Sequence, residues 1–384
     1  GARVDDERPF TWRLRGRVIH LYDFGLRLPA VPDTAGSRQR FIDAFDASYR
    51  GRCESDQYNK LVLVAGLTWQ QVVWLRAIGR FLKQARVGFS QDYLASCLLA
   101  NPALAGGLVQ TFGAKFDPDG RGDWEGSMAE VTAGLEQVDS LDQDRILRMY
   151  LAFIGACKRT NAFVPDSGDI EWALAFKIAS EELELLPRPR PTAEIFVYSP
   201  RVNGVHLRFG KVARGGLRWS DRAEDFRTEV LGLVKAQTVK NTVIVPVGAK
   251  GGFVPQHLPD PSDRAAWLAE GTACYRIFIS ALLSVTDNIV DGSVRHPDRV
   301  ECHDEDDPYL VVAADKGTAS FSDVANEIST RRGFWLADAF ASGGSAGYAH
   351  KAMGITAAGA WEAVKRHFRE LGIDPQATDF TCVG

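Results

Sequence analysis

The sequence predicts an α/β protein with a helical N-terminal region, and three observations support this fold class. Residues 1–185 are dominated by runs whose apolar residues recur at helical spacing. After them, strand-like runs alternate with helical runs, which is typical of a largely parallel or mixed sheet covered by helices. The stretch 186–192 between the two regions is rich in proline and has the composition of a linker. We therefore expect a domain boundary there.

Helix-start signals place several helices in the first region. Thr68-x-x-Gln71 and Ser140-x-x-Gln143 are capping-box patterns, and apolar residues follow each of them at helical spacing. Asn101-Pro102 indicates a break between two helices. Nothing in residues 1–185 suggests chemistry, so we expect a helical support or assembly region.

The second region alternates strands and helices along the chain. Strands are expected at residues 194–198, 204–209, 242–247 and 309–313. Helices are expected at residues 225–240, 262–286, 321–330 and 354–371. A last strand is expected at residues 378–383, with Gly384 as the first glycine of the turn that follows it.

Composition narrows the classes of function. A formal net charge of −4 gives no electrostatic reason to expect nucleic acid or an anionic membrane as a partner. The longest apolar run, residues 61–67, is too short to span a bilayer, and no signal- or transit-peptide pattern opens the chain. Both ends look cut, so we expect a segment of a longer polypeptide. The cysteines are scattered without a C-x-x-C pair, which predicts reduced thiols in a cytoplasmic protein: Cys53, Cys97, Cys157, Cys274, Cys302 and Cys382.

Glycine-rich segments with charged residues are the strongest candidates for a functional site. Glycine lets a backbone approach a ligand closely, and such segments lie at residues 214–218, 248–252 and 342–347. Lys250 follows the strand expected at 242–247 and is flanked by glycines, so it is a candidate for a partly desolvated amine. A surface-turn lysine explains the local sequence equally well. Asp315 ends an apolar run, and ligands usually bind at the carboxyl ends of strands in α/β domains.

Three further patterns favour structural explanations over chemistry. The segment around Lys250 lacks the spacing and the Lys-Ser/Thr pair of a P-loop. Ser345 lies in a Gly-x-Ser-x-Gly pattern like that of hydrolases, but residues 334–340 before it look helical where that motif needs a strand. Residues 301–307 place potential metal ligands at adjacent positions, not at spacings that converge on an ion. We expect a solvated acidic loop there and no metal site.

Several motifs, taken in order, resemble those of the glutamate dehydrogenases. They are Arg214-Gly-Gly-Leu-Arg218, Thr238-Val-Lys240, Pro246-Val-Gly-Ala-Lys-Gly-Gly252 and Ala314-Asp-Lys-Gly-Thr318. Longer runs at residues 306–319 and 339–348 resemble the large bacterial NAD-dependent enzymes in particular. The close resemblance runs from about residue 155 to the end of the chain, whereas the first 150 residues resemble the family only loosely.

This resemblance implies roles for individual residues. Lys250 is similar by position to the family's catalytic lysine, and Asp315 to its catalytic aspartate. Lys240 is similar to the lysine that binds the substrate's α-carboxylate. Arg214 stands where smaller members carry a lysine for the side-chain carboxylate, which replaces a point charge with a planar fork. The adjoining Gly215-Gly216 belongs to the same substrate-binding segment.

The resemblance also implies a reaction and a domain plan. The reaction is NAD-dependent oxidative deamination of L-glutamate to 2-oxoglutarate and ammonia, carried out by a homo-oligomer. Residues 186–350 would form the α/β substrate-binding domain, and residues 351–384 the start of a Rossmann-type NAD domain. Thr356 would lie near the nicotinamide and Gly384 near the pyrophosphate, with most of the NAD site beyond residue 384. Two alternatives stay open: a related amino-acid dehydrogenase with another substrate, and a non-catalytic scaffold segment.

Overall fold

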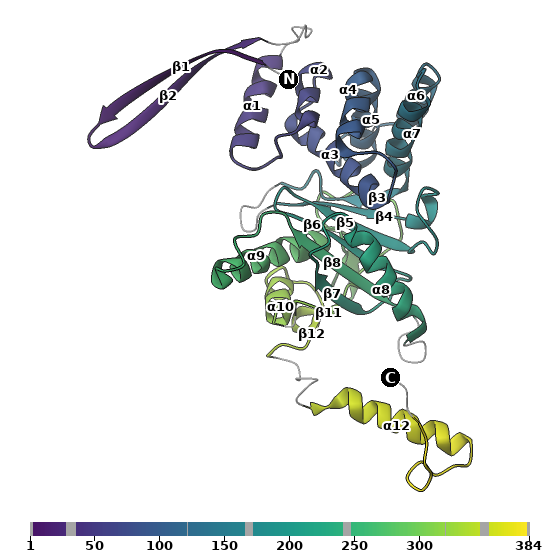
Figure 1. Cartoon of the computed structure of the whole chain (residues 1–384). Coiled ribbons are helices and arrows are strands. Elements are labelled where there is room, and N and C mark those ends of the chain that lie inside the picture. The colour runs from purple at the N-terminus through teal and green to yellow at the C-terminus, as the bar shows by residue number, and fades with distance from the viewer. Residues whose placement is uncertain are drawn as a thin grey trace.

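The chain combines a layer of helices with a mixed sheet. A computed structural model describes residues 3–27, 36–120, 122–165, 172–240, 247–318, 320–345 and 353–381, without the side chains of 238–240 and 356. Figure 1 shows the helical layer stacked on the sheet, a hairpin that projects from the helical end, and a C-terminal helix set apart beyond the sheet. The predicted α/β class with a helical N-terminal region is confirmed at this level.

The helical layer follows the predicted start and stop signals. Its helices are α1 (Ser37–Tyr49), α2 (Leu61–Val64), α3 (Trp69–Gln84), α4 (Gln91–Ala100), α5 (Pro102–Phe116), α6 (Trp124–Leu135) and α7 (Leu141–Ala156), with the 3₁₀ turn η1 (Gln57–Lys60). The break at Asn101 is confirmed, and α4 and α5 meet there at a bend of 101°. In the described part of the chain no single helix is long and apolar enough to cross a membrane, although this bent pair has the length and composition.

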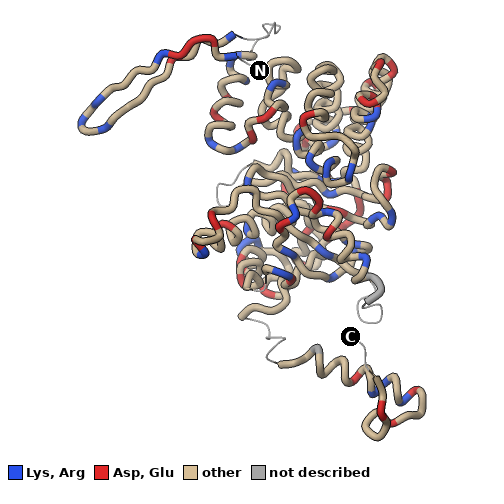
Figure 2. Tube along the Cα trace, viewed as in Figure 1, with Lys and Arg blue, Asp and Glu red and all other residues tan. Residues whose placement is uncertain are grey.

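An antiparallel hairpin precedes the helices and was not predicted. Its strands are β1 (Arg3–Leu14) and β2 (Arg17–Arg27), and every residue in both is exposed. The turn between them has positive φ angles at Arg15 and Gly16, which suits the right-handed twist of a hairpin. Figure 2 shows acidic residues near the base of this hairpin and basic residues at its turn.

The sheet has eight strands in the order β12-β11-β7-β8-β6-β5-β4-β3. In chain order the strands are β3 (Cys157–Thr160), β4 (Leu174–Ile178), β5 (Ala193–Tyr198), β6 (Val202–Arg208), β7 (Gly215–Trp219), β8 (Ala249–Pro255), β11 (Val312–Ala314) and β12 (Ala341–Ser342). The four strands from β12 to β8 are parallel to one another, whereas each pair from β8 to β3 is antiparallel. Strand β8 is thus the point at which the sheet changes from parallel to antiparallel pairing. A separate small hairpin joins β9 (Asn288–Val290) and β10 (Ser293–Arg295).

Helices cover both faces of the sheet, and each face has its own apolar cluster. One face packs against α8 (Phe226–Lys240) and the helical layer, the other against α9 (Arg264–Leu283) and α10 (Ser322–Arg331). The helical layer shares its core with the first face, where Phe81 contacts Phe196 with ring centroids 5.5 Å apart. The boundary expected at residue 186 therefore does not separate two cores. Strands β3 and β4 precede it, and the proline-rich stretch connects the 3₁₀ turn η2 (Ser180–Glu182) to β5 within the sheet.

Most elements predicted for the second region are confirmed, with three differences. The four predicted helices correspond to α8, α9, α10 and α12 (Ile355–Glu370). The strand expected at 309–313 is shorter and forms β11. The strand expected at 242–247 lies almost entirely outside the described residues, and Val247 itself is not in a strand. Residues 378–381 form no strand and 382–384 lie outside the description, so the start of a Rossmann domain stays a prediction.

Candidate functional site

The parallel half of the sheet brings the two predicted catalytic residues together. Lys250 is the second residue of β8, and Asp315 directly follows β11; β7 lies between these strands and is parallel to both. The amine Nζ of Lys250 lies 2.8 Å from Oδ2 of Asp315, and each side chain is 17% exposed. The strand that Lys250 was expected to follow lies almost entirely outside the described residues, and Lys250 itself lies inside β8. Its backbone is therefore held between β6 and β7.

The loop after β11 fixes the carboxylate of Asp315. The Lys316 N–H donates to Oδ1 at 2.7 Å, and the Asp315 N–H donates to the Thr318 hydroxyl at 3.0 Å. That hydroxyl donates in turn to the carbonyl oxygen of Leu217 in β7 at 2.7 Å. Burial by itself raises the pKa of Asp315. Hydrogen bonds from Lys250 and the Lys316 N–H, together with the positive charges of Lys250 and Arg218, lower it by more. The pKa of Asp315 therefore lies below its ordinary value.

A second cation, not predicted as a site residue, lies beside Asp315. Arg218 of β7 places a guanidinium nitrogen 3.5 Å from Oδ1 of Asp315 and another 2.9 Å from Glu229 of α8. Glu229 also accepts a hydrogen bond of 2.6 Å from the Ser220 hydroxyl. Side chains alternate between the two faces of a strand, so Arg218 lies on the same face of β7 as Gly216, two residues earlier. This alternation could have indicated Arg218 as a site residue.

Both glycines of the predicted substrate-binding segment have a packing reason of their own. A Cβ at Gly215 would lie 1.4 Å from the carbonyl oxygen of Ala249, so β7 and β8 meet too closely there for any side chain. A Cβ at Gly216 would lie 3.0 Å from both Asp315 Cβ and the Ala314 carbonyl oxygen. These glycines therefore allow β7 to lie close to β8, which carries Lys250, and to the end of β11, which Asp315 follows. Contact of Gly215 and Gly216 with substrate stays a prediction.

The remaining predicted site residues are placed less completely. Arg214 is exposed and forms a backbone bridge with Gly248 at the entrance to β7 and β8. Lys240 is the last residue of α8, but its side chain lies outside the described residues. Thr356 lies in α12 with its side chain undescribed, and Gly384 lies outside the described residues altogether.

The acidic loop at residues 301–307 is solvated in part, as predicted: Glu301, Glu305 and Asp306 are exposed, whereas Asp304 is partly buried and Asp307 is buried. Asp307 is buried, forms an ion pair of 2.6 Å with Lys177 Nζ and accepts a hydrogen bond of 2.9 Å from Arg208. Asp304 forms ion pairs with Lys177 and Arg159, each with an N···O distance of 2.5 Å. These cations belong to β3, β4 and β6, so the loop neutralises charges buried on the sheet. The burial of these two carboxylates was not predicted, because the sequence does not show which cations meet the loop.

One group among the described residues has the geometry to hold a metal ion: Asp287, His296 and Cys302. Two contacts favour an ion-pair network instead. Arg159 donates to Asp287 Oδ1 at 2.5 Å, and His296 lies 2.8 Å from the same oxygen. Burial also raises the pKa of Cys302 to about 11, which opposes the thiolate that a metal requires. The arrangement therefore fits a charge network better than a metal centre.

Ser345 does not resemble a hydrolase nucleophile in its contacts. Its hydroxyl and its N–H both donate to Asp323 of α10, at 2.9 and 2.7 Å. The helix expected over residues 334–340 is only the 3₁₀ turn η3 (Ala337–Ala339). Among the described residues, the partner of this hydroxyl is the carboxylate of Asp323 rather than the histidine or lysine that activates such nucleophiles.

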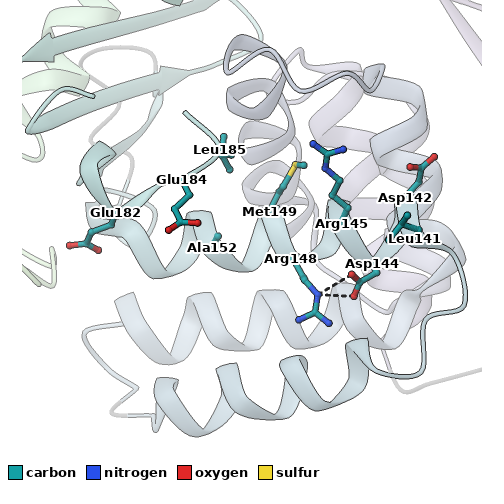
Figure 3. A pocket seen from close by; sticks show the side chains of 10 residues that line it. All are labelled: Leu141, Asp142, Asp144, Arg145, Arg148, Met149, Ala152, Glu182, Glu184 and Leu185. Atoms are coloured by element: carbon teal, nitrogen blue, oxygen red, sulfur yellow. Dashed lines mark hydrogen bonds and ion pairs between the residues drawn. The ribbon is translucent and has the colours of Figure 1, made fainter. Parts of the chain in front are cut away.

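One hollow of the described structure lies elsewhere. It has a volume of about 680 Å³ and lies along α7, and neither Lys250 nor Asp315 lines it (Figure 3). Arg148 and Asp144 form an ion pair of 2.8 Å across part of its wall. Because this hollow holds neither of the residues that the resemblance implies for catalysis, the Lys250–Asp315 contact remains the better site candidate.

Comparison with known proteins decides the family. A family model described as "Bacterial NAD-glutamate dehydrogenase, catalytic domain" matches residues 130–384. The chain belongs to this family. A second model, "Glutamate dehydrogenase, helical motif 3", matches residues 53–118, which include α3 and α4. The resemblance noted in the sequence is therefore confirmed, and it extends into the helical layer.

Individual glutamate dehydrogenases align with most or all of the chain. It is 54% identical to an NAD-specific glutamate dehydrogenase of Mycobacterium tuberculosis over 406 aligned residues, covering 100% of this chain and 25% of that protein. A protein of the same name from Halomonas elongata is 53% identical, and the alignment covers 100% of this chain and 24% of that protein. A protein of the same name from Neurospora crassa is 24% identical, and the alignment covers 82% of this chain and 31% of that protein. The chain thus spans about a quarter of the length of the bacterial relatives it matches.

Proposed function

We propose that the enzyme containing this segment catalyses NAD-dependent oxidative deamination of L-glutamate to 2-oxoglutarate and ammonia. The observation that carries the proposal is the 2.8 Å contact between Lys250 and Asp315, the two residues that the family resemblance implies for catalysis. The names of the bacterial relatives agree with this activity. The segment would supply the substrate half of the site.

The contact suits proton transfer during the reaction. Asp315 would take a proton from the substrate's amino group, and the 2.8 Å contact would allow a proton to pass between Asp315 and Lys250. Lys250 in its neutral form would remove a proton from the water that attacks the iminium carbon, and its cationic form would stabilise the oxygen that develops negative charge. NAD supplies the acceptor for the hydride that leaves the substrate's α-carbon.

A dicarboxylate substrate needs two cationic partners. We assign Lys240 to the α-carboxylate and Arg214 to the γ-carboxylate, because charge-assisted hydrogen bonds of this kind are the strong ones. Arg214 is exposed at the entrance to the paired strands β7 and β8, where a carboxylate could reach it. Most of the NAD site is assigned to polypeptide outside these residues, with Thr356 and Gly384 at its edge. A homo-oligomer and a cytoplasmic location, which the free thiols of the described cysteines suit, belong to the same proposal.

Replacement of Lys250 tests the proposal directly. In the full-length enzyme, Lys250→Ala should lower kcat by about 10²–10⁴-fold, the usual share of general acid–base catalysis. The assay is glutamate-dependent formation of NADH, with circular dichroism to check that the variant folds. Lys211→Ala is the matched control, since Lys211 is an exposed lysine that pairs with Glu305.

The same assay separates the alternatives. Near-wild-type turnover of Lys250→Ala would reject the assigned mechanism. Faster NADH formation with a monocarboxylic amino acid than with glutamate would favour the related dehydrogenase. A wild-type enzyme with no amino-acid-dependent activity would favour the scaffold.

A further inference from the structure

The two oxygens of the Asp315 carboxylate face different partners. Oδ2 lies 2.8 Å from Lys250, the contact on which the proposed chemistry depends. Oδ1 accepts the Lys316 N–H at 2.7 Å and faces Arg218 at 3.5 Å. One oxygen is therefore held by its surroundings while the other is directed at the amine. A carboxylate fixed in this way presents a single oxygen for proton exchange.

Arg218 is itself held in place by a chain of partly buried contacts. Its guanidinium donates to Glu229 at 2.9 Å, and Glu229 accepts the hydroxyl of Ser220 at 2.6 Å. The side chains of Arg218 and Glu229 are 19% and 14% exposed. The contacts connect the end of β7, the first turn of α8 and the loop after β11. They meet on the face of the sheet that carries Lys250, because Gly252, two residues after Lys250 in β8, packs against Val230 of α8.

The contact between Arg218 and Asp315 is too long to be a strong hydrogen bond. At 3.5 Å it lies outside the usual range for N–H···O contacts, whereas the contact of Arg218 with Glu229 lies inside that range. Arg218 therefore acts on Asp315 mainly as a nearby positive charge whose location Glu229 fixes. A guanidinium serves this purpose well because it remains charged at every physiological pH.

We propose that Arg218 is a positioning residue of the dehydrogenase reaction, which keeps Asp315 ionised with Oδ2 directed at Lys250, and that Glu229 orients Arg218 for this task. The inference rests on the proposed function and adds residues to which the resemblance gave no role. Arg218 need not touch substrate for this. Its effect would appear in the rate and in its pH dependence, because it acts through Asp315.

The sign of the pH effect follows from the groups around Asp315. They are Lys250 on β8, Arg218 on β7, Glu229 on α8 behind Arg218, and Lys316 on the loop itself. If ionised Asp315 accepts the substrate's proton, removal of the Arg218 charge raises the pKa of Asp315 and moves the acid limb of the kcat profile to higher pH. Removal of the Glu229 charge takes away an anion, so it should not move that limb upward.

The experiment compares four variants of the full-length enzyme: Arg218→Gln, Arg218→Lys, Glu229→Gln and Arg222→Gln. Arg222→Gln is the matched control, because Arg222 pairs with Asp225 on the surface of the same connection. We expect Arg218→Gln to lower kcat by up to about 10²-fold with the acid limb moved to higher pH and the KM for glutamate little changed. Arg218→Lys should restore the acid limb and part of kcat. Glu229→Gln should lower kcat without the upward movement of the limb.

Two results would overturn the inference. An unchanged kcat and acid limb in Arg218→Gln would show that the charge does not act on Asp315. A raised KM for glutamate at constant kcat would make Arg218 a substrate-binding residue instead. If Arg218→Gln fails to fold, Glu229→Gln decides the matter, since an unchanged kcat there removes the orienting role. Failure of the proposed function is distinguishable, because it would appear as a wild-type enzyme without glutamate-dependent NADH formation.

Discussion

Gly216→Ala would place a methyl group against the loop that carries Asp315. A Cβ there lies 3.0 Å from the Ala314 carbonyl oxygen and 3.0 Å from Asp315 Cβ, whereas ordinary contacts begin at 3.4 Å. The loop or β7 must therefore give by a few tenths of an ångström, up to 3.4 − 3.0 = 0.4 Å. Such overpacking costs about 1–3 kcal/mol of folding free energy. A misplacement of 1 Å costs about 10²-fold in rate, so a shift of this smaller size should lower kcat roughly tenfold.

The assay is glutamate-dependent NADH formation by the full-length enzyme, combined with the midpoint of thermal unfolding. Gly232→Ala is the matched control, because Gly232 lies in α8 and an added Cβ there meets nothing within 4 Å. It should keep the wild-type kcat and stabilise the protein by about 0.5–1 kcal/mol, as alanine does in helices. If Gly216→Ala matches the wild type in both kcat and unfolding midpoint, the close approach of β7 to the Asp315 loop does not constrain the site.

Two further predictions concern stability. Asp307→Asn removes the carboxylate between two buried cations and should lower the free energy of unfolding, measured by urea denaturation, by about 3–5 kcal/mol. Asp306→Asn is the control and should lower it little, because the Asp306 side chain is 61% exposed. Equal effects of the two substitutions would contradict the buried network. Burial lowers the pKa of Lys115 from 10.5 to about 8. Between pH 8 and pH 10.5 the unfolded state therefore binds more protons than the folded state. The free energy of unfolding rises with pH across this range, by up to about 3 kcal/mol. Urea titrations at both ends of that window should show this rise in the wild type but not in Lys115→Met.

Local sequence signals predicted helix starts well, up to the point where a distant partner competes. At Thr68 both bonds of the capping box form, at 3.3 and 2.9 Å. At Ser140 only half of the box forms: the serine hydroxyl accepts the N–H of Gln143, but the Gln143 side chain accepts a hydrogen bond from Asn101 instead. The first hairpin was missed because its turn is Arg15-Gly16, without the Asn-Gly or Asp-Gly signal on which such predictions depend.

The site itself could not be derived from local sequence alone. Lys250 and Asp315 are 65 residues apart, and only the pairing of β7 with both β8 and β11 brings them together. The family resemblance supplied both residues, but not Arg218, whose role depends on a helix that packs across its strand. The burial of Asp304 and Asp307 was missed for the same reason, since their partners come from strands 99 to 145 residues away in the chain.

The position of β8 determines which of the two reactive groups stays still. Its backbone pairs on both edges and both faces of the sheet are covered, so the amides around Lys250 should exchange with solvent only when the whole domain opens. Asp315 instead follows β11, a strand of three residues, and depends on a short loop for its position. Any opening and closing of the pair during turnover should therefore be carried out by the aspartate, which approaches and leaves a lysine whose backbone is fixed.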